Sequence, residues 1–244
     1  MLPNLTPFFK QPYQAYARGV SLQSSHPTLD FAEFITSAHF VDHVTHFSRQ
    51  QGVMKPRAQA SVWHMHYTLS IFPSIIVSQS LLKTSLPLQL HELSYEPKHM
   101  RILLPSQGSE CLIDNTDSRY RGLLFDHLSP LHDCLQEQFG VKKRTLWSNC
   151  FYRLNDLFET IVQIVGPHPT LVTDRQILNH ADNIAQLNNP LKFKTITCHD
   201  KNGHYQLRPE CCLLHQREDG SYCHDCPKHK HHMQHVKARR HKTR

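Results

Sequence analysis

Four cysteines stand close together near the C-terminal end of this 244-residue chain. Cys211 and Cys212 are adjacent in sequence, and Cys223 and Cys226 follow as a Cys-x-x-Cys pair. An Asp-Gly pair at positions 219–220 lies between them, where a turn would bring the second pair back against the first. Grouped thiolates select zinc or an iron–sulfur cluster over hard cations. The sequence therefore predicts a metal centre on these four cysteines.

The adjacent pair is the unusual half of this motif. Neighbouring side chains in an extended backbone diverge, so both can bind metal only if the backbone bends there. Ordinary zinc ribbons use two spaced pairs instead. On spacing alone, a structural zinc site and an iron–sulfur cluster are equally good interpretations, and disulfides are a distant third.

The motif and its flanks resemble a known family. The segments Arg-x-x-Cys-Cys-Leu at 208–213 and Cys-x-x-Cys-Pro at 223–227 are similar to the C-terminal signature of FhuF-type ferric-siderophore reductases. The resemblance implies a [2Fe–2S] cluster on the four cysteines. The chain departs from the pattern at His215, where the family pattern suggests tyrosine. A second, weaker likeness is Leu-Trp-Ser-Asn at 146–149, similar to a Leu-Trp-Gly-Asn element of the same family.

The resemblance also implies an activity. The protein would be an oxidoreductase, a ferric-siderophore reductase that transfers one electron to Fe(III) and releases Fe(II), with hydroxamate siderophores as the first class to test. Arg208, His215 and His224 are candidates to donate hydrogen bonds that raise the cluster potential. No substrate-binding residue is predicted. The alternative is a zinc-stabilised binding or interaction protein whose basic tail contacts a partner.

Several common motifs are absent from the sequence. The 8 glycines form no Gly-x-Gly-x-x-Gly for a dinucleotide, and there is no phosphate-binding Gly-x-x-x-x-Gly-Lys. The nucleophile motif Gly-x-Ser-x-Gly is also missing. A redox protein without a nicotinamide or flavin motif needs an external electron donor, such as a ferredoxin or a ferredoxin reductase.

Composition and the first residues predict a cytoplasmic protein, with a peripheral membrane association left open. The hydrophobic fraction is 39%, and no apolar run approaches the ~20 residues that span a bilayer. The first residues lack the basic and apolar regions of a secretion signal. Thiols stay reduced in the cytosol and remain available as ligands. The other four cysteines are scattered and are interpreted as small core residues: Cys111, Cys134, Cys150 and Cys198.

The positive charge is concentrated at the end of the chain. The formal net charge is +7, and seven basic residues follow the last acidic one, Asp225, so the remainder has a net charge of 7 − 7 = 0. A nucleic-acid-binding domain would instead carry its basic patch on folded elements. Nucleic acid is therefore not an expected partner, and residues 228–244 are predicted to be a basic, histidine-rich, disordered tail.

The spacing of apolar residues predicts the elements that position the motif. Helices are expected over 28–52, from Pro56 towards Pro87, and over 119–139, 145–165 and 173–187. Thr28 and the pair 173–174 would cap two of these helices, and Pro73 should kink another. Strands are expected at 88–93, 99–104, 193–198 and 205–207, with 105–118 as loop.

These elements predict an α+β fold, a helix-dominated single domain with short antiparallel strands and a C-terminal cysteine cluster lobe. Residues 1–207 would form the scaffold and contain the substrate region. Residues 208–227 would form the cluster motif, and residues 228–244 the tail.

Overall fold

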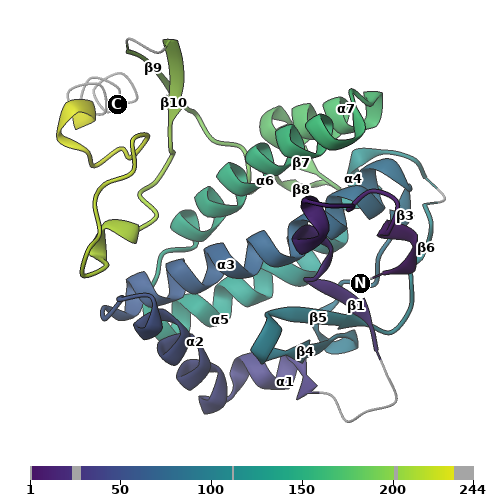
Figure 1. Cartoon of the computed structure of the whole chain (residues 1–244), viewed down its shortest axis with the longest axis horizontal. Helices are drawn as coiled ribbons and strands as arrows, with labels where there is room; N and C mark the ends of the chain where they lie inside the picture. The colour runs from purple at the N-terminus through teal and green to yellow at the C-terminus, as the bar shows by residue number, and fades with distance from the viewer. Residues whose placement is uncertain (1, 24–28, 112, 201–202, 234–244) are drawn as a thin grey trace.

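The computed structural model describes residues 2–23, 29–111, 113–200 and 203–233, and it shows helices gathered around one central helix, α3 (Figure 1). The α-helices are α1 (Phe31–Thr36), α2 (Ala38–Gln50), α3 (Pro56–Ile76), α4 (Thr116–Arg121), α5 (Ser129–Phe139), α6 (Lys143–Val165) and α7 (Pro169–His180). Two π-helical segments continue helices, namely η3 (Val77–Leu81) and η6 (Gly122–Leu128). Short 3-10 turns are η1 (Pro3–Leu5), η2 (Tyr13–Ala17), η4 (Leu90–Glu92), η5 (Pro97–His99), η7 (Leu214–Gln216) and η8 (Lys230–His232).

The strands are short. They are β1 (Val20–Leu22), β2 (Leu29–Asp30), β3 (Thr84–Ser85), β4 (Ser94–Glu96), β5 (Arg101–Leu104), β6 (Ser109–Glu110), β7 (Asn183–Ile184), β8 (Leu187–Asn188), β9 (Ile196–Asp200) and β10 (Gly203–Leu207). The larger sheet has the order β1-β5-β4-β2, and β1 runs parallel to β5 while the other pairs are antiparallel. The predicted helix-dominated α+β class is confirmed.

Helix α3 is buried on most of its surface because α2, α5 and α6 all pack against it. The apolar residues at helical spacing on which this helix was predicted are Val62, Met65, Leu69, Phe72 and Ile76, and this stripe is only part of the contact. Met65 and Leu69 lie on it but are partly exposed, whereas Trp63 and Tyr67, off the stripe, are fully buried. A helix covered on several sides has no single apolar face, so a stripe could not identify its packing residues.

The helix predicted over 28–52 is two helices. Ser37 adopts an extended conformation and separates α1 from α2. The cap is Asp30, whose carboxylate accepts a hydrogen bond from the Glu33 amide at 2.8 Å. Thr28, the predicted cap, lies outside the described residues.

The helix predicted over 119–139 begins three residues earlier and runs through α4, η6 and α5. Asn115 caps it by accepting a hydrogen bond from the Ser118 amide at 2.8 Å, within the segment expected to be loop. Gly140 ends it with φ of 68°, a left-handed conformation that glycine adopts without steric cost. The helix predicted over 145–165 is confirmed as α6.

Three predictions about other elements are wrong. Residues 88–93 do not form a strand, because Leu90 and Leu93 are both buried at the three-residue spacing of a 3-10 turn, and the strand β4 begins at Ser94. Asp174 does not cap a helix. It lies inside α7, fully buried, where its carboxylate accepts hydrogen bonds from Arg119, Thr116 and Ser80. Residues 183–188 form the small β7–β8 pair rather than the end of that helix.

The hairpin before the cysteines is observed as predicted. Strands β9 and β10 pair antiparallel, with Tyr205 opposite Cys198. Asn202, in the predicted turn, lies outside the described residues. In Figure 1 the hairpin extends from the helices and leads into the C-terminal lobe, which lies near the N-terminal end of α3. None of the described helices has the length and apolar character needed to cross a bilayer.

Candidate metal centre

The four clustered cysteines meet as two pairs of sulfur atoms. The Sγ atoms of Cys211 and Cys226 are 3.6 Å apart, and those of Cys212 and Cys223 are 3.8 Å apart. Three of the four residues are buried, and Cys223 is partly exposed. The adjacent cysteines therefore face different partners, and each takes one member of the Cys-x-x-Cys pair.

The backbone around the motif bends where the vicinal cysteines require it. Leu213, directly after them, has φ of 65°, a left-handed conformation that turns the chain into η7. The amide of Gly220 donates to the carbonyl of Arg217 at 3.0 Å. A Cβ atom at Gly220 would lie 2.8 Å from the carbonyl oxygen of Leu214. This close approach explains why glycine occupies the return turn.

Helices α3 and α6 hold the cysteine segment by hydrogen bonds. The Ser61 hydroxyl donates to the carbonyl of Cys212 at 2.7 Å, and the Asn149 amide donates to Ser61 at 3.0 Å. The Ser148 hydroxyl accepts a hydrogen bond from the amide of Glu210 at 3.1 Å. The Leu-Trp-Ser-Asn element therefore helps to hold the cysteine segment in place, through Ser148 and Asn149. Ser61 had no sequence signal, because its partner is 151 positions away.

Apolar contacts and a β-bridge complete this attachment. Val53, Ala58 and Val62 form a small buried cluster against which Leu213 and Leu214 pack. Val53 also forms an antiparallel bridge with Arg217, and the amide of Glu218 donates to the carbonyl of Gly52 at 3.0 Å. The lobe therefore packs on the loop between α2 and α3 and on the first turns of α3.

A hydrogen bond joins the two sulfurs of each pair and shifts their pKa values in opposite directions. A hydrogen bond from Cys226 lowers the pKa of Cys211 to about 7, and one from Cys223 lowers the pKa of Cys212 to about 6. The pKa values of Cys223 and Cys226 are raised because these thiols donate those hydrogen bonds. Two of the four thiols are thus close to the thiolate form at neutral pH, which is the form that binds metal.

Arg208 lies beside the pairs and is held by two groups. Its Nε donates to the carboxylate of Asp225 at 3.1 Å, and its guanidinium lies 3.4 Å from the centroid of the Tyr152 ring. The Arg208 amide donates to the carbonyl of Asp225 at 2.9 Å, which links the two ends of the motif. Its positive charge also contributes to the lowered pKa of Cys212, after the hydrogen bond from Cys223.

The two predicted histidines occupy different places. His215 Nδ1 lies 3.5 Å from the Sγ of Cys211, and its ring stacks on Tyr222 at 4.4 Å. An aromatic side chain from elsewhere in the motif therefore accompanies the histidine that replaces the expected tyrosine. His224 lies against Tyr205, with ring centroids 4.4 Å apart.

The first residues of the expected disordered tail are folded. His232 is 4% exposed, donates through Nδ1 to the carbonyl of Cys226 at 2.8 Å, and accepts through Nε2 from the Tyr205 hydroxyl at 2.8 Å. Through His232, the first part of the predicted tail therefore packs against the cysteine motif. Residues 234–244 lie outside the described residues.

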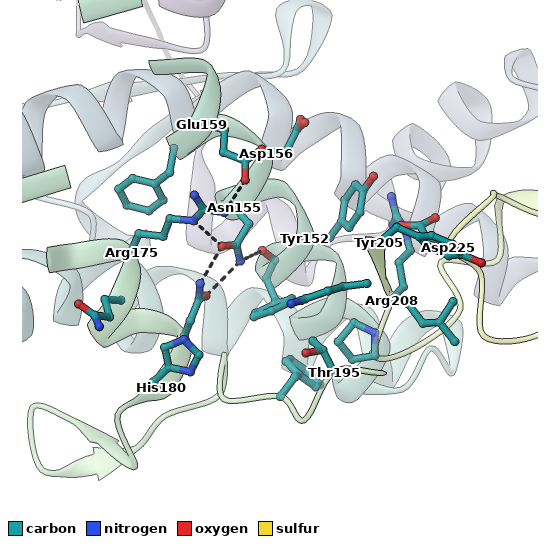
Figure 2. Close-up of a pocket in the computed structure, with 18 of the residues that line it drawn as sticks. Tyr152, Asn155, Asp156, Glu159, Arg175, His180, Thr195, Tyr205, Arg208 and Asp225 are labelled. Atoms are coloured by element: carbon teal, nitrogen blue, oxygen red, sulfur yellow. Dashed lines mark hydrogen bonds and ion pairs between the residues drawn. The ribbon is translucent and has the colours of Figure 1, made fainter. Parts of the chain in front are cut away.

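A pocket of about 1160 Å³ opens beside the centre (Figure 2). Helices α6 and α7 line one side, and strand β10 with the start of the cysteine segment lines the other. Cys223 and Asp225 contribute to its wall, so the pocket reaches one of the sulfur pairs.

Polar side chains organise the far end of this pocket, as Figure 2 shows. Asn155 accepts hydrogen bonds from Arg175 at 2.9 Å and from Asn179 at 2.7 Å. Arg175 also pairs with Glu159 at 2.5 Å. Sequence reasoning missed these residues, because they are ordinary polar positions on α6 and α7 until the C-terminal lobe lies opposite them.

The remaining cysteines lie apart from the centre. All eight cysteines are free in the structure. Cys150 and Cys198 are buried, as predicted, whereas Cys111 and Cys134 are partly exposed.

Comparison with protein families gives one match. Residues 82–203 match the family described as ferric iron reductase FhuF-like transporter. The matched segment contains α6 and its Leu-Trp-Ser-Asn element, and it ends before the four cysteines. Comparison with the curated proteins finds no match.

Proposed function

The chain belongs to the FhuF-like ferric iron reductase family, and on that premise we propose that it reduces ferric siderophores by one electron. In this proposal a [2Fe–2S] cluster is held by Cys211, Cys212, Cys223 and Cys226. The observation that carries the proposal is the arrangement of these sulfurs in two pairs beside a pocket of about 1160 Å³.

The donor set fits two tetrahedral irons. Metal–sulfur bonds of about 2.3 Å in tetrahedral geometry put two sulfurs on one ion about 3.8 Å apart. The observed separations are 3.6 and 3.8 Å. Cys211 with Cys226 would hold one iron, and Cys212 with Cys223 the other. A single zinc ion would instead need all four sulfurs in one group, whereas here they meet as two pairs.

When bound, such a cluster supplies single electrons at a potential set by charge, hydrogen bonds and solvent exposure. Arg208 contributes a positive charge near Cys212, and His215 lies at Cys211. Both would favour the reduced, more negative state. His224, which contacts Tyr205, would act on the pocket wall rather than on a sulfur.

The pocket supports a chelate substrate. Its volume of about 1160 Å³ is slightly above the roughly 300–1,000 Å³ of sites that enclose drug-sized ligands, so a ligand of several hundred daltons can enter it. The Asn155, Asn179 and Arg175 network gives this wall the polar character that the amide and hydroxamate groups of a siderophore need, and its groups would exchange some of their mutual hydrogen bonds for bonds to the chelate. Hard oxygen donors hold Fe(III) far better than Fe(II), so one electron converts a tight complex into a labile one. The chain's own task is to hold the chelate against the wall that contains Cys223.

The electrons would come from another protein. The sequence contains no dinucleotide-binding glycine motif, so an external donor of the ferredoxin or ferredoxin reductase type is part of the proposal. We place the reaction in the cytoplasm, where thiol ligands stay reduced.

The test uses anaerobically purified full-length protein. Visible absorption that dithionite bleaches is expected, together with two irons and two sulfides per chain. The reduced, desalted protein is then mixed with a ferric hydroxamate and a ferrous chelator. Cluster reoxidation should accompany Fe(II) capture.

Two results would contradict the proposal. Colourless protein with stoichiometric zinc would favour the zinc-stabilised interaction protein instead. A cluster that stays reduced over a panel of ferric siderophores, with the ferrous chelator present, would show that the acceptor is something else.

A further inference from the structure

Three buried side chains that no part of the proposed reaction uses converge in the core. They are His64 of α3, His132 of α5 and Cys150 of α6, and all three are 0% exposed. Their ligand atoms all lie within 4.8 Å of one another. We propose that His64, His132 and Cys150 bind one soft, monovalent metal ion, Cu(I), at a second centre distinct from the four cysteines.

The separations resemble those around a three-coordinate ion. With metal–nitrogen bonds of about 2.05 Å and a metal–sulfur bond of about 2.3 Å, planar coordination sets sulfur–nitrogen edges of about 3.8 Å and a nitrogen–nitrogen edge of about 3.5 Å. The Sγ of Cys150 lies 3.7 Å from His64 Nε2 and 3.9 Å from His132 Nε2. The two Nε2 atoms are 2.8 Å apart, so the rings must separate slightly when the ion enters.

Hydrogen bonding alone does not account for the burial of His64 and His132. One proton can lie between the two Nε2 atoms, but the Nδ1 atoms of both rings are buried without a hydrogen-bond partner among the described residues. His127, another fully buried histidine, differs in this respect. It donates through Nδ1 to the carbonyl of Leu88 at 3.0 Å and accepts from the Tyr67 hydroxyl at 2.6 Å. An imidazole pair left half-satisfied in an apolar core is costly unless it has another role.

The protonation states suit ligation. Burial lowers the pKa of His64 to about 3 and lowers that of His132 as well, so both rings are neutral, the form that coordinates metal. Burial raises the pKa of the Cys150 thiol, so this group keeps its proton until the ion binds and displaces it, as happens in a coordinated thiol. No redox step is involved in filling the site.

Charge selects the ion. One thiolate and two neutral imidazoles with Cu(I) make a neutral group, whereas Zn²⁺ would leave a net positive charge in a site with 0% exposure. Zinc would also need a fourth ligand, and the cluster of potential ligand atoms among the described residues contains only these three. Soft sulfur and imidazole donors in a trigonal set are typical copper ligands.

The proposed copper site lies next to Ser61 and Asn149, the residues that hold the four-cysteine segment. His64 is one helical turn beyond Ser61, which donates to Cys212, and Cys150 follows Asn149, which donates to Ser61. An ion bound by side chains of α3, α5 and α6 would hold α3 and α6, which carry Ser61 and Asn149, in fixed positions relative to each other.

The experiment measures metal in the cluster-loaded full chain. Wild-type protein is produced in cells supplied with a copper salt and, separately, with a zinc salt, and its metal content is read by native mass spectrometry. Wild type is expected to retain one copper per chain in addition to the cluster iron. Copper K-edge absorption should show two nitrogen ligands and one sulfur ligand.

The variants His132→Gln and Cys150→Ala should retain about tenfold less copper than wild type, or less still, while keeping their cluster iron. The matched controls His127→Gln, at another buried histidine, and Cys198→Ala, at another buried cysteine, should retain copper at the wild-type level.

Four outcomes would overturn the proposal. These are a wild type that retains no ion beyond the cluster iron, zinc retained in place of copper, copper retained in both ligand variants, and copper lost equally in the controls. The iron content separates this test from that of the reductase, because either centre can fail while the other remains.

Discussion

At the scale of single residues, the pairing of sulfurs divides the eight cysteines of this chain into four that meet near the C-terminal end and four that lie apart from them. Cys211 and Cys212 each contact one member of the Cys-x-x-Cys pair, whereas Cys198 lies in the β9–β10 hairpin opposite Tyr205. Spacing in the sequence predicted this division, because ligands a few residues apart need only a local turn to meet.

Replacing Cys212 with serine should remove the cluster or change its visible spectrum strongly. The substitution would deprive one iron of the proposed cluster of a thiolate, and it leaves Cys223 without its sulfur partner. Iron and sulfide content and the absorption spectrum report the result. The control Cys198→Ser should keep full cluster occupancy, and an unchanged spectrum in Cys212→Ser would show that this cysteine is not a ligand.

At the scale of elements, helix α3 determines where the cysteine lobe can sit. Ser61 connects the lobe to both helices, because its hydroxyl donates to the carbonyl of Cys212 and accepts a hydrogen bond from the side-chain amide of Asn149. The contact joins positions far apart in the sequence, so it depends on α3 and α6 lying side by side with the lobe across their ends.

Replacing Ser61 with alanine should destabilise the protein by about 1–3 kcal/mol, since two buried polar groups lose their partner. Urea unfolding measures this cost, and the rate of iron loss should rise in parallel. Ser78 provides the matched control. It is fully buried in the π-helical continuation of the same helix, and its hydroxyl has no hydrogen-bond partner among the described residues.

Ser78→Ala should therefore change the free energy of unfolding little. Equal losses in both variants would mean that the cost comes from core packing and not from the bond to Cys212.

At the scale of the whole molecule, the core contains histidines that stay neutral in the folded state. His127 is fully buried, and burial lowers its pKa from 6.5 to about 4, partly opposed by the hydrogen bond to the carbonyl of Leu88. Above pH 6.5 the ring is neutral in both the folded and the unfolded chain. Below that value only the unfolded chain takes up a proton, so folding stability falls as the pH falls towards 4.

This histidine alone should cost about 3 kcal/mol of unfolding free energy between pH 6.5 and pH 4, since each pKa unit corresponds to about 1.4 kcal/mol. The measurement is the difference in unfolding free energy between wild type and His127→Gln over that range. Wild type should lose more stability than the variant on acidification. Parallel pH profiles would show that His127 titrates alike in both states.

The sequence by itself determined the features that depend on neighbours along the chain. The four-cysteine motif, helix α6 and the β9–β10 hairpin all follow from local spacing, and their positions agree with the structure. The predicted strand at 88–93 and the predicted cap at Asp174 failed for the opposite reason. Contacts with distant segments decided those conformations, namely burial of Leu90 and Leu93 in the core and the pairing of Asp174 with Arg119.

Only the tertiary structure decided which sulfur meets which, which side chains hold the motif in place, and where a pocket opens beside it. The link from Ser61 to Cys212 spans 151 positions, and the contact of His64 with His132 spans 68. A pattern in the sequence reports the period of one element, whereas these sites arise where several elements pack together. Their residues are therefore ordinary serines, histidines and asparagines until the core assembles.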